Sequence, residues 1–138
     1  MENQNRVIKA LGEIALRVQD LEEMQKFYAE VVGLEFLQRF PQAAFFRIAE
    51  GFGGHTQILA LFDRSANGDY QGIQIEKSTI DHIAFTIALE DFESEKQRLE
   101  NLGCSVWTTT HAWVHWRSLY FNDPEGNLVE FVCYDATI

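Results

Sequence analysis

Two stretches of the sequence decide the fold: EIALRVQDLEEMQKFYAEVVGLEF, residues 13–36, and HIAFTIALEDFESEKQRLENLGCSV, residues 82–106. Each begins with a short alternating segment, passes through an acidic stretch into an apolar pattern of helical spacing, and reaches a glycine suited to a helix C-terminus. Glu13 and His82 are 69 positions apart, and Gly33 and Gly103 are 70 apart. The chain is therefore predicted to contain an internal repeat that keeps its register to within one residue.

Three strand-like segments follow each predicted helix, so each copy is predicted to be a β-α-β-β-β unit. They are LEFLQRF, AAFFRIAE and TQILALF in the first copy, and CSVWTTT, WRSLYF and NLVEFVCY in the second. The stretch between the copies is rich in Gly, Asn, Asp and Ser, as is typical of a linker. We expect one α+β domain over residues 1–138, with module one at about 10–63, a linker at about 64–78 and module two at about 79–134.

Composition excludes several function classes. The 138 residues suit a single domain, and the hydrophobic content of 46% supplies a core for it. The formal net charge of −10 repels phosphate backbones and anionic lipids, which argues against nucleic acid and membrane partners. No apolar run approaches the roughly 20 residues that span a bilayer, and the sequence starts without a signal-peptide pattern. Cys104 and Cys133 form no disulfide-type pattern, so we expect a cytoplasmic protein.

Alternation within the strands separates a helix-facing side from a side that lines a cavity, since successive side chains point to opposite faces. In the first copy Ile14, Leu16 and Val18 share the apolar face, and the equivalent side chains of the second are Ile83, Phe85, Ile87 and Leu89. The opposite faces, which begin at Glu13 and His82, are small or polar. This predicts an eight-stranded open barrel with helices outside and a concavity inside.

The repeat also pairs two positions at the ends of the copies. Glu130 and Ala60 are 70 positions apart, the same offset as the helix glycines. Four inward positions, two from each copy, are thus predicted to converge: Glu13, His82, Ala60 and Glu130. Three of the four carry side chains able to bind a metal or move a proton.

The stretch WRSLYFNDPEGNLVEF, residues 116–131, resembles the last β-hairpin of the vicinal oxygen chelate superfamily, which includes glyoxalase I, bleomycin resistance proteins and extradiol dioxygenases. Glu130 matches that superfamily's last metal-binding carboxylate and His82 its histidine at the start of the second copy. Glu13 stands where many members have a histidine or glutamine. The resemblance implies a divalent ion (Mn, Fe, Ni or Zn) held by Glu13, His82 and Glu130, with positions open for two adjacent oxygens of a substrate.

Ala60 departs from the pattern, because glyoxalase I carries a carboxylate ligand there that also transfers the proton. We therefore expect a lyase, isomerase or dioxygenase other than glyoxalase I, with Glu130 also acting as a catalytic residue. The alternative is a protein of the bleomycin-resistance type that sequesters a small molecule without chemistry. Structural explanations stay open too: each acid or histidine could instead be a hydrogen-bonded strand residue.

Four more residues are candidates from their position in the sequence. Arg17 lies on the cavity face, where it could bind a substrate carboxylate or form an ion pair with Glu13 or Glu35. Trp113 and Trp116 suit an aromatic or hydrophobic ligand, or else packing at a dimer contact. His115 beside them is a candidate acid/base. Open strand edges and the family pattern predict a homodimer.

Overall fold

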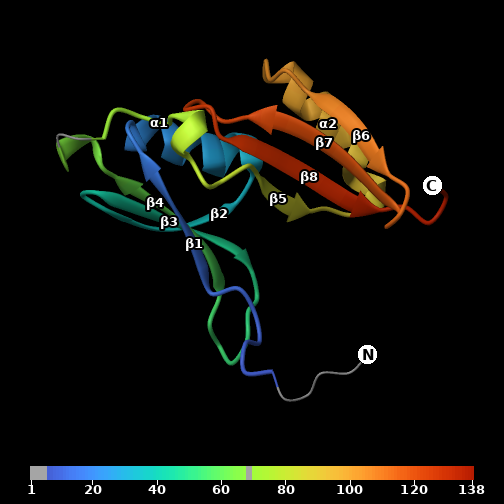
Figure 1. Ribbon diagram of the computed structural model, residues 1–138, viewed down its shortest axis with the longest axis horizontal. Helices are drawn as coiled ribbons and strands as arrows, with labels where there is room; N and C mark the ends of the chain where they lie inside the picture. Colours follow the sequence, from blue (N-terminus) through green and yellow to red (C-terminus); the bar gives the residue numbers. More distant parts are fainter. Residues whose placement is uncertain (1–5, 68–69) are drawn as a thin grey trace. The chain divides into compact units, whose positions relative to one another are not determined.

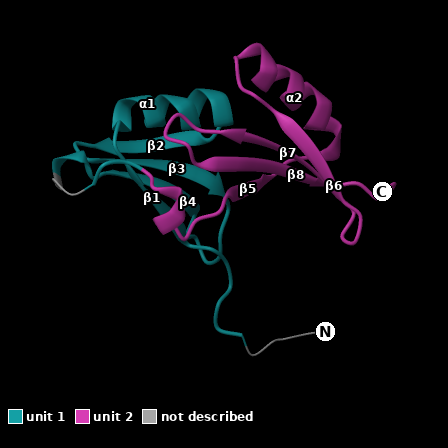
Figure 2. Ribbon diagram, turned by 45° about the horizontal axis from the view of Figure 1, so that its top comes forward, with its two compact units in different colours: residues 1–72 teal, residues 73–138 magenta. Residues whose placement is uncertain are grey.

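The computed structural model describes residues 6–67 and 70–138, which form two compact units: residues 1–72 and residues 73–138 (Figure 2). The boundary between the units falls inside the predicted linker, of which residues 68 and 69 lie outside the described residues. The α+β class is confirmed, and the eight strands found in the described residues form two sheets of four. The extent of the domain as a whole stays a prediction.

The first unit combines a helical segment with a four-stranded sheet (Figure 1). Its elements are β1 (Glu13–Val18), α1 (Leu21–Lys26), η1 (Phe27–Val32), β2 (Glu35–Phe40), β3 (Ala43–Ala49), β4 (Gln57–Asp63) and the short 3₁₀ turn η2 (Ser65–Asn67). The sheet order is β1-β4-β3-β2, with β1 parallel to β4 and the other pairs antiparallel.

The helix of this unit begins and ends where the sequence places it. The Asp20 side chain accepts a hydrogen bond from the Glu23 backbone N–H at 3.1 Å, which caps the N-terminus. Gly33 closes the C-terminus with a φ of 91°, a left-handed conformation that glycine adopts without a Cβ penalty. The second half, η1, is a π-helix and not the regular α-helix that the spacing predicts. Met24, Tyr28 and Val32 are nonetheless buried along one side.

The second unit repeats this plan. Its elements are η3 (Ile75–Lys77), β5 (Ile83–Thr86), η4 (Leu89–Asp91), α2 (Phe92–Asn101), β6 (Trp107–His111), β7 (Trp116–Asn122) and β8 (Leu128–Tyr134). The sheet order is β5-β8-β7-β6, with β5 parallel to β8 and the other pairs antiparallel. Each unit is thus the predicted β-α-β-β-β module, apart from short 3₁₀ turns.

Strand register shows that the two sheets correspond residue by residue. In the first sheet Ala60 pairs with Ala15 on β1 and with Phe45 on β3. In the second, Glu130 pairs with Ala84 on β5 and with Tyr120 on β7. The predicted equivalence of Ala60 with Glu130 is therefore confirmed. Glu13 and His82 are equivalent by the same register, since each precedes the paired alanine by two residues.

The predicted helix-facing sides of the strands are the buried ones. Leu16 and Val18 of β1 are buried while Glu13, Ala15 and Arg17 are exposed, and β5 shows the same alternation. In the first unit α1 packs on β3 and β4, and the Tyr28 ring contacts the Phe46 ring at a centroid distance of 6.4 Å. This packing leaves the opposite face of the first sheet without α1.

A buried carboxylate anchors the C-terminal segment to β7. Asp135 accepts hydrogen bonds from the Thr137 hydroxyl at 2.6 Å and from Arg117 Nη2 at 2.8 Å. These bonds lower the pKa of Asp135 from 3.8 to about 2, and the bond from Thr137 has the larger effect. A depressed carboxyl pKa means that the ionised form stabilises the fold above the unfolded-state pKa.

The Asp135→Asn variant is expected to melt at a lower temperature than the wild type at neutral pH. Because the stabilisation is lost as pH falls from about 4 towards about 2, the difference in melting temperature should shrink across that interval. Thermal unfolding of both proteins by circular dichroism at several pH values measures this. A difference that stays constant between these pH values contradicts the anchoring role.

Candidate metal centre

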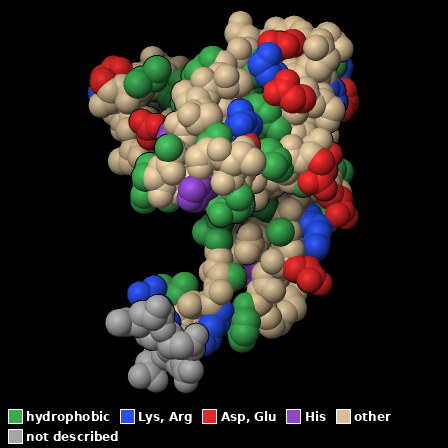
Figure 3. Space-filling model, turned by 90° about the vertical axis from the view of Figure 1, so that its right-hand side faces the viewer, with side chains coloured by type: hydrophobic (Ala, Val, Ile, Leu, Met, Phe, Trp, Pro, Cys, Tyr) green, Lys and Arg blue, Asp and Glu red, His purple; other side chains and the backbone are tan. Residues whose placement is uncertain are grey.

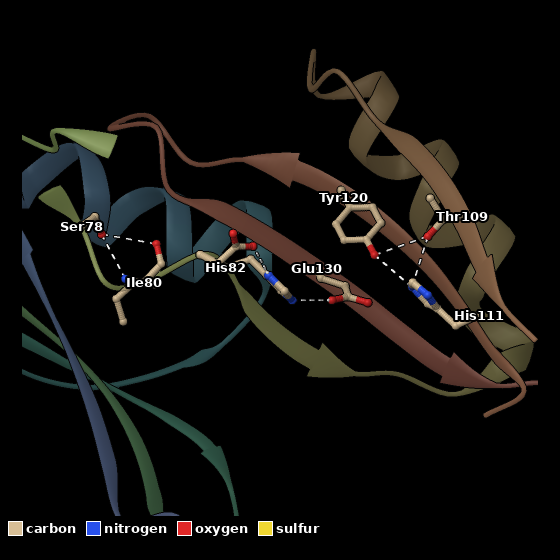
Figure 4. A network of polar contacts seen from close by, with 8 residues as sticks. Ser78, Ile80, His82, Thr109, His111, Tyr120 and Glu130 are labelled. Atoms are coloured by element: carbon tan, nitrogen blue, oxygen red, sulfur yellow. Dashed lines mark hydrogen bonds and ion pairs between the residues drawn. The ribbon is translucent and has the colours of Figure 1, made fainter. Parts of the chain in front are cut away.

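His82 and Glu130 come together on the face of the second sheet that does not carry α2. His82 immediately precedes β5 and Glu130 lies in β8, and the parallel register between the two strands sets both side chains on the same face. His82 Nε2 lies 3.1 Å from Glu130 Oε1 (Figure 4). Two residues separated by 48 positions in the sequence thus form one polar pair.

The Glu130 carboxylate is buried and held from its other oxygen. Its side chain is 7% exposed, and the hydroxyl of buried Ser118 donates to Glu130 Oε2 at 2.6 Å. A buried carboxylate is destabilising unless its oxygens have partners, so this hydrogen bond fixes the side chain while Oε1 faces His82. The side chain is therefore oriented before any ligand binds.

The His82 ring is oriented in the same way from its second nitrogen. His82 Nδ1 lies 2.7 Å from Asp81 Oδ1, so both ring nitrogens face carboxylate oxygens. A neutral imidazole has only one N–H to donate, which leaves the other lone pair facing an acceptor. The arrangement is satisfied by a second proton or by a cation between Nε2 and Glu130. Metal-binding histidines commonly donate the other ring N–H to a carboxylate, as Nδ1 can do here.

The separation of the two facing atoms fits adjacent ligands of one ion. Two ligands at right angles on bonds of about 2.1 Å are about 3.0 Å apart, and the observed separation is 3.1 Å. Across residues 6–67 and 70–138, no three His, Cys, Asp or Glu side chains form a cluster able to hold an ion by themselves. His82 and Glu130 are thus two candidate ligands, and a complete site would need further ones.

The first sheet carries the remaining predicted positions of the set. Glu13 and Arg17 are exposed on β1, on the face opposite to α1, and the Arg17 backbone carbonyl accepts a hydrogen bond from Tyr70 at 3.3 Å. Ala60 is fully buried on β4. The suggested ion-pair partner Glu35 lies 3.7 Å from Arg47 instead. The convergence of Glu13 with His82 and Glu130 stays a prediction.

The other candidates lie in the turn between β6 and β7 and at the first residue of β7. Trp113 is 83% exposed, and its ring contacts that of Trp116 at a centroid distance of 6.4 Å. His115 adopts a left-handed φ of 61°, its Nδ1 contacts the Ile138 carbonyl oxygen, and its ring contacts Tyr134. One nitrogen of the candidate acid/base His115 is therefore engaged by the backbone, and the exposed tryptophans form an aromatic surface.

Sequence reasoning missed three residues around the pair: Asp81, Ser118 and Tyr120. Tyr120 is the cross-strand neighbour of Glu130 on β7, and its ring contacts that of His82 at a centroid distance of 6.4 Å. The sequence did contain the information that places Tyr120 and Ser118. In a hairpin whose turn is centred on Glu125, residues at equal distances before and after Glu125 are paired, so their residue numbers sum to 250. Hairpin counting from the Asp123–Asn127 turn thus sets Tyr120 opposite Glu130.

Surface charge and thiol chemistry agree with the composition. Lysine and arginine side chains are scattered over the face in Figure 3 and form no single patch there. Burial raises the pKa of both Cys104 and Cys133, which disfavours the reactive thiolate. In the part of the chain that the structure describes, no helix is long and apolar enough to cross a membrane.

Comparison with known proteins assigns the family. Residues 10–131 match the model of the Glyoxalase/Bleomycin resistance protein/Dioxygenase superfamily. The chain belongs to this superfamily. Within it, the chain is 30% identical over 124 residues to glutathione transferase FosA from Serratia marcescens, a match that covers 90% of this chain and 80% of that protein. The predicted resemblance to the vicinal oxygen chelate superfamily is thereby confirmed.

Solved structures of superfamily members share the fold. A glyoxalase/dioxygenase from Nostoc punctiforme is 23% identical, with a TM-score of 0.75 over 98% of this chain and 97% of its own. A variant of the fosfomycin resistance protein FosX from Listeria monocytogenes, complexed with Mn(II) and dihydroxypropylphosphonic acid, is 23% identical with a TM-score of 0.69 over 94% of each chain. FosA is named as a transferase, so the relatives of this chain include an enzyme.

Proposed function

We propose that the chain is a metal-dependent enzyme that acts on a small molecule with two adjacent oxygens, with His82, Glu130 and Glu13 as the protein ligands of a divalent ion. The observation that carries the proposal is the contact of His82 Nε2 with Glu130 Oε1, in which each side chain is braced from its far side by Asp81 or Ser118. Such bracing keeps ligands in place against the mutual repulsion of an empty site.

The residues have distinct roles in this proposal. Ser118 holds Glu130 Oε2 so that Oε1 faces His82, and Asp81 holds His82 Nδ1 so that Nε2 faces Glu130. A divalent ion, when bound, polarises two adjacent substrate oxygens as a Lewis acid. Glu130 and His115 are the proposed proton-transfer groups. Arg17, Trp113 and Trp116 are the proposed substrate contacts, with Arg17 directed at an anionic group and the tryptophans at apolar parts.

Relatives and ligand chemistry support the proposed metals and reaction classes. A set of one imidazole and two carboxylates suits Mn²⁺, Fe²⁺, Ni²⁺ or Zn²⁺, and the FosX structure contains Mn(II). The name of FosA, a glutathione transferase, adds glutathione transfer to the lyase, isomerase and dioxygenase reactions considered from the sequence. Glyoxalase I activity is disfavoured, because Ala60 provides neither the fourth ligand nor the base.

A second candidate is a binding protein that sequesters its ligand, as favoured by Trp113 at 83% exposure beside Trp116. We also expect the protein to be cytoplasmic and to form a homodimer. The edge strand β2 exposes the apolar side chains of Phe36, Leu37 and Phe40, which pairing of two copies would cover.

Metal uptake tests the proposal. We expect wild-type protein dialysed against Mn²⁺, Fe²⁺, Ni²⁺ or Zn²⁺ to retain about one ion per chain of at least one metal, measured by plasma emission spectroscopy, since the braced pair is a preformed site. The His82→Ala variant should retain less than about a tenth as much. His55→Ala is the matched control, because His55 is exposed in the β3–β4 connection. Wild-type protein that retains none of the four metals contradicts the proposal.

Turnover separates the enzyme from the binding protein. The metal-loaded chain is incubated with fosfomycin and glutathione, with the hemithioacetal of methylglyoxal and glutathione, and with catechols, and products are followed by NMR. Conversion of one of these that is lost in His82→Ala supports the enzyme. Tight binding with every compound recovered unchanged supports the binding protein instead.

A further inference from the structure

The face of the first sheet opposite to α1 carries a row of phenylalanine rings that ends at an arginine. The Phe40 ring contacts the Phe45 ring edge to face at a centroid distance of 5.8 Å, and the Phe45 ring contacts the Phe62 ring in the same way at 5.8 Å. The Arg64 guanidinium lies over the Phe62 ring, with Cζ 5.1 Å from the ring centroid. These contacts form one continuous apolar surface with a cation at one end.

Strand register brings a second arginine to the same end of this surface. Arg17 on β1 is the parallel partner of Phe62 on β4, on strands about 5 Å apart. The neighbours of Arg17 in β1, Leu16 and Val18, are buried on the face that carries α1, so the exposed Arg17 side chain stands on the opposite face. Figure 2 shows α1 on one side of this sheet. Arg17 and Arg64 therefore both stand next to the Phe62 ring.

These two arginines differ from the other arginine on the same face. Arg47 on β3 lies 3.7 Å from the Glu35 carboxylate and is thereby paired. Within the described residues, neither the Arg17 nor the Arg64 guanidinium has a carboxylate oxygen within 4 Å. An arginine that stands beside an aromatic ring without an acid is able to bind an external anion through its paired N–H groups.

The acidic side chains nearest in sequence do not neutralise this end of the face. Asp63 Oδ1 accepts hydrogen bonds from the Ser65 backbone N–H at 2.8 Å and from the Ser65 hydroxyl at 2.6 Å, and alternation puts Asp63 on the α1 side. Glu13 shares the face with Arg17 but lies four residues away, which is about 13 Å along an extended strand. A local excess of positive charge is thus maintained in a chain of net charge −10.

We infer that Arg17, Arg64 and Phe62 bind the anionic end of a small aromatic molecule. Its carboxylate or sulfonate group accepts hydrogen bonds from the two guanidinium groups. Its ring packs against Phe62 and against Phe45 beside it, where edge-to-face contact between aromatic rings is favourable. Binding at this surface requires no metal and no reaction.

The position of the surface also specifies the shape of the substrate, a step that rests on the proposed function. The proposed metal ligand Glu13 and the anion-binding Arg17 are about 13 Å apart along β1. One molecule held at both places has its metal-binding oxygens at one end and its anionic group at the other. The apolar part that joins them lies along the phenylalanine rings.

The test compares two probes that differ only in charge: 4-phenylbutyrate and 4-phenylbutanol. Each is titrated into the full-length protein in the presence of EDTA, and binding is followed by two-dimensional NMR. The variants are Arg17→Gln, Arg64→Gln and Phe62→Leu, with melting temperatures measured for each. Arg47→Gln is the matched control, because it removes the same charge from the same face at an arginine that already has a partner.

The wild type is expected to bind phenylbutyrate about tenfold or more tightly than phenylbutanol, since the carboxylate adds charge-assisted hydrogen bonds. Arg17→Gln and Arg64→Gln should each weaken phenylbutyrate binding by about tenfold and leave phenylbutanol binding unchanged. Phe62→Leu should weaken the binding of both probes. Arg47→Gln should match the wild type. Because Arg17 is exposed, Arg17→Gln tests the site even if Arg64→Gln is destabilised.

Other outcomes overturn the inference and can be told apart from failure of the proposed function. Wild-type protein that binds neither probe, or binds both equally, contradicts the anion site. Equal losses of phenylbutyrate affinity in Arg17→Gln and Arg47→Gln contradict a specific role for Arg17. All of these measurements are made without metal, so they leave the proposed metal centre intact. Protein that retains no divalent ion but binds phenylbutyrate as expected contradicts the proposed function and supports the anion site.

Discussion

Replacing Glu130 with glutamine is expected to lower metal affinity by about 100-fold or more while leaving the protein folded. Loss of a partner that merely braces a ligand typically lowers affinity 10- to 100-fold, so loss of a ligand should lower it at least as much. Glutamine has nearly the same volume, and its carbonyl oxygen can still accept the hydrogen bond from Ser118, which is 2.6 Å from the carboxylate in the wild type. Isothermal titration with Mn²⁺ measures the change.

The matched control for Glu130→Gln is Glu93→Gln, which removes one negative charge from the exposed side of α2. It distinguishes loss of a ligand from a general loss of negative charge in a chain of net charge −10. Equal reductions in Mn²⁺ affinity in the two variants contradict a specific role for Glu130. Glu130→Gln protein that unfolds at room temperature assigns Glu130 a structural role instead.

The second large effect is expected at Ala60, the position equivalent to Glu130 in the first sheet. Glu130 has Ser118 and His82 as partners. In the first sheet, strand register sets Ala43 at the position equivalent to Ser118 and Glu13 at the position equivalent to His82. A glutamate at position 60 would be buried without a donor and close to a second carboxylate. We expect Ala60→Glu to destabilise the metal-free protein by about 3 kcal/mol or more.

Divalent metal should reverse much of this destabilisation in Ala60→Glu. If Glu13 belongs to the metal site, a carboxylate at position 60 adds a ligand, and an ion that binds only the folded state stabilises it in proportion to its affinity. Melting temperatures with and without Mn²⁺ are the measurement, and Mn²⁺ should raise that of Ala60→Glu more than that of the wild type. Ala60→Gln is the control, because it adds similar bulk without the charge. A destabilised Ala60→Glu protein whose Mn²⁺ affinity equals that of the wild type contradicts the site.

Much of the fold could be predicted because its determinants are local and occur twice. Alternation in β1 and β5 identified the buried faces, and Gly33 and Gly103 marked helix ends, where both adopt a φ above 90°. The π-helical geometry of η1 could not be predicted, because the same apolar spacing satisfies either helix once Tyr28 packs on Phe46.

The site could be predicted only in part, because several of its residues are brought together by contacts between strands. The repeat identified His82 and Glu130, whose contact the structure shows. Asp81 gave no signal, because an acid that precedes a strand usually faces water, and here its contact depends on the rotamer of the next residue. Ser118 and Tyr120 required the exact β7–β8 register, which the hairpin turn contains but residue types alone do not.

Anomalous diffraction from crystals soaked in Mn²⁺ tests the central claim most directly, because it locates the ion without reference to any substrate. The account predicts one Mn²⁺ peak per chain within bonding distance, about 2.0–2.3 Å, of both His82 Nε2 and Glu130 Oε1, with a carboxylate oxygen of Glu13 as a further ligand. The peak should be absent from crystals of Glu130→Gln. A wild-type crystal with no peak between His82 and Glu130, or with one only at exposed surface carboxylates, contradicts the claim.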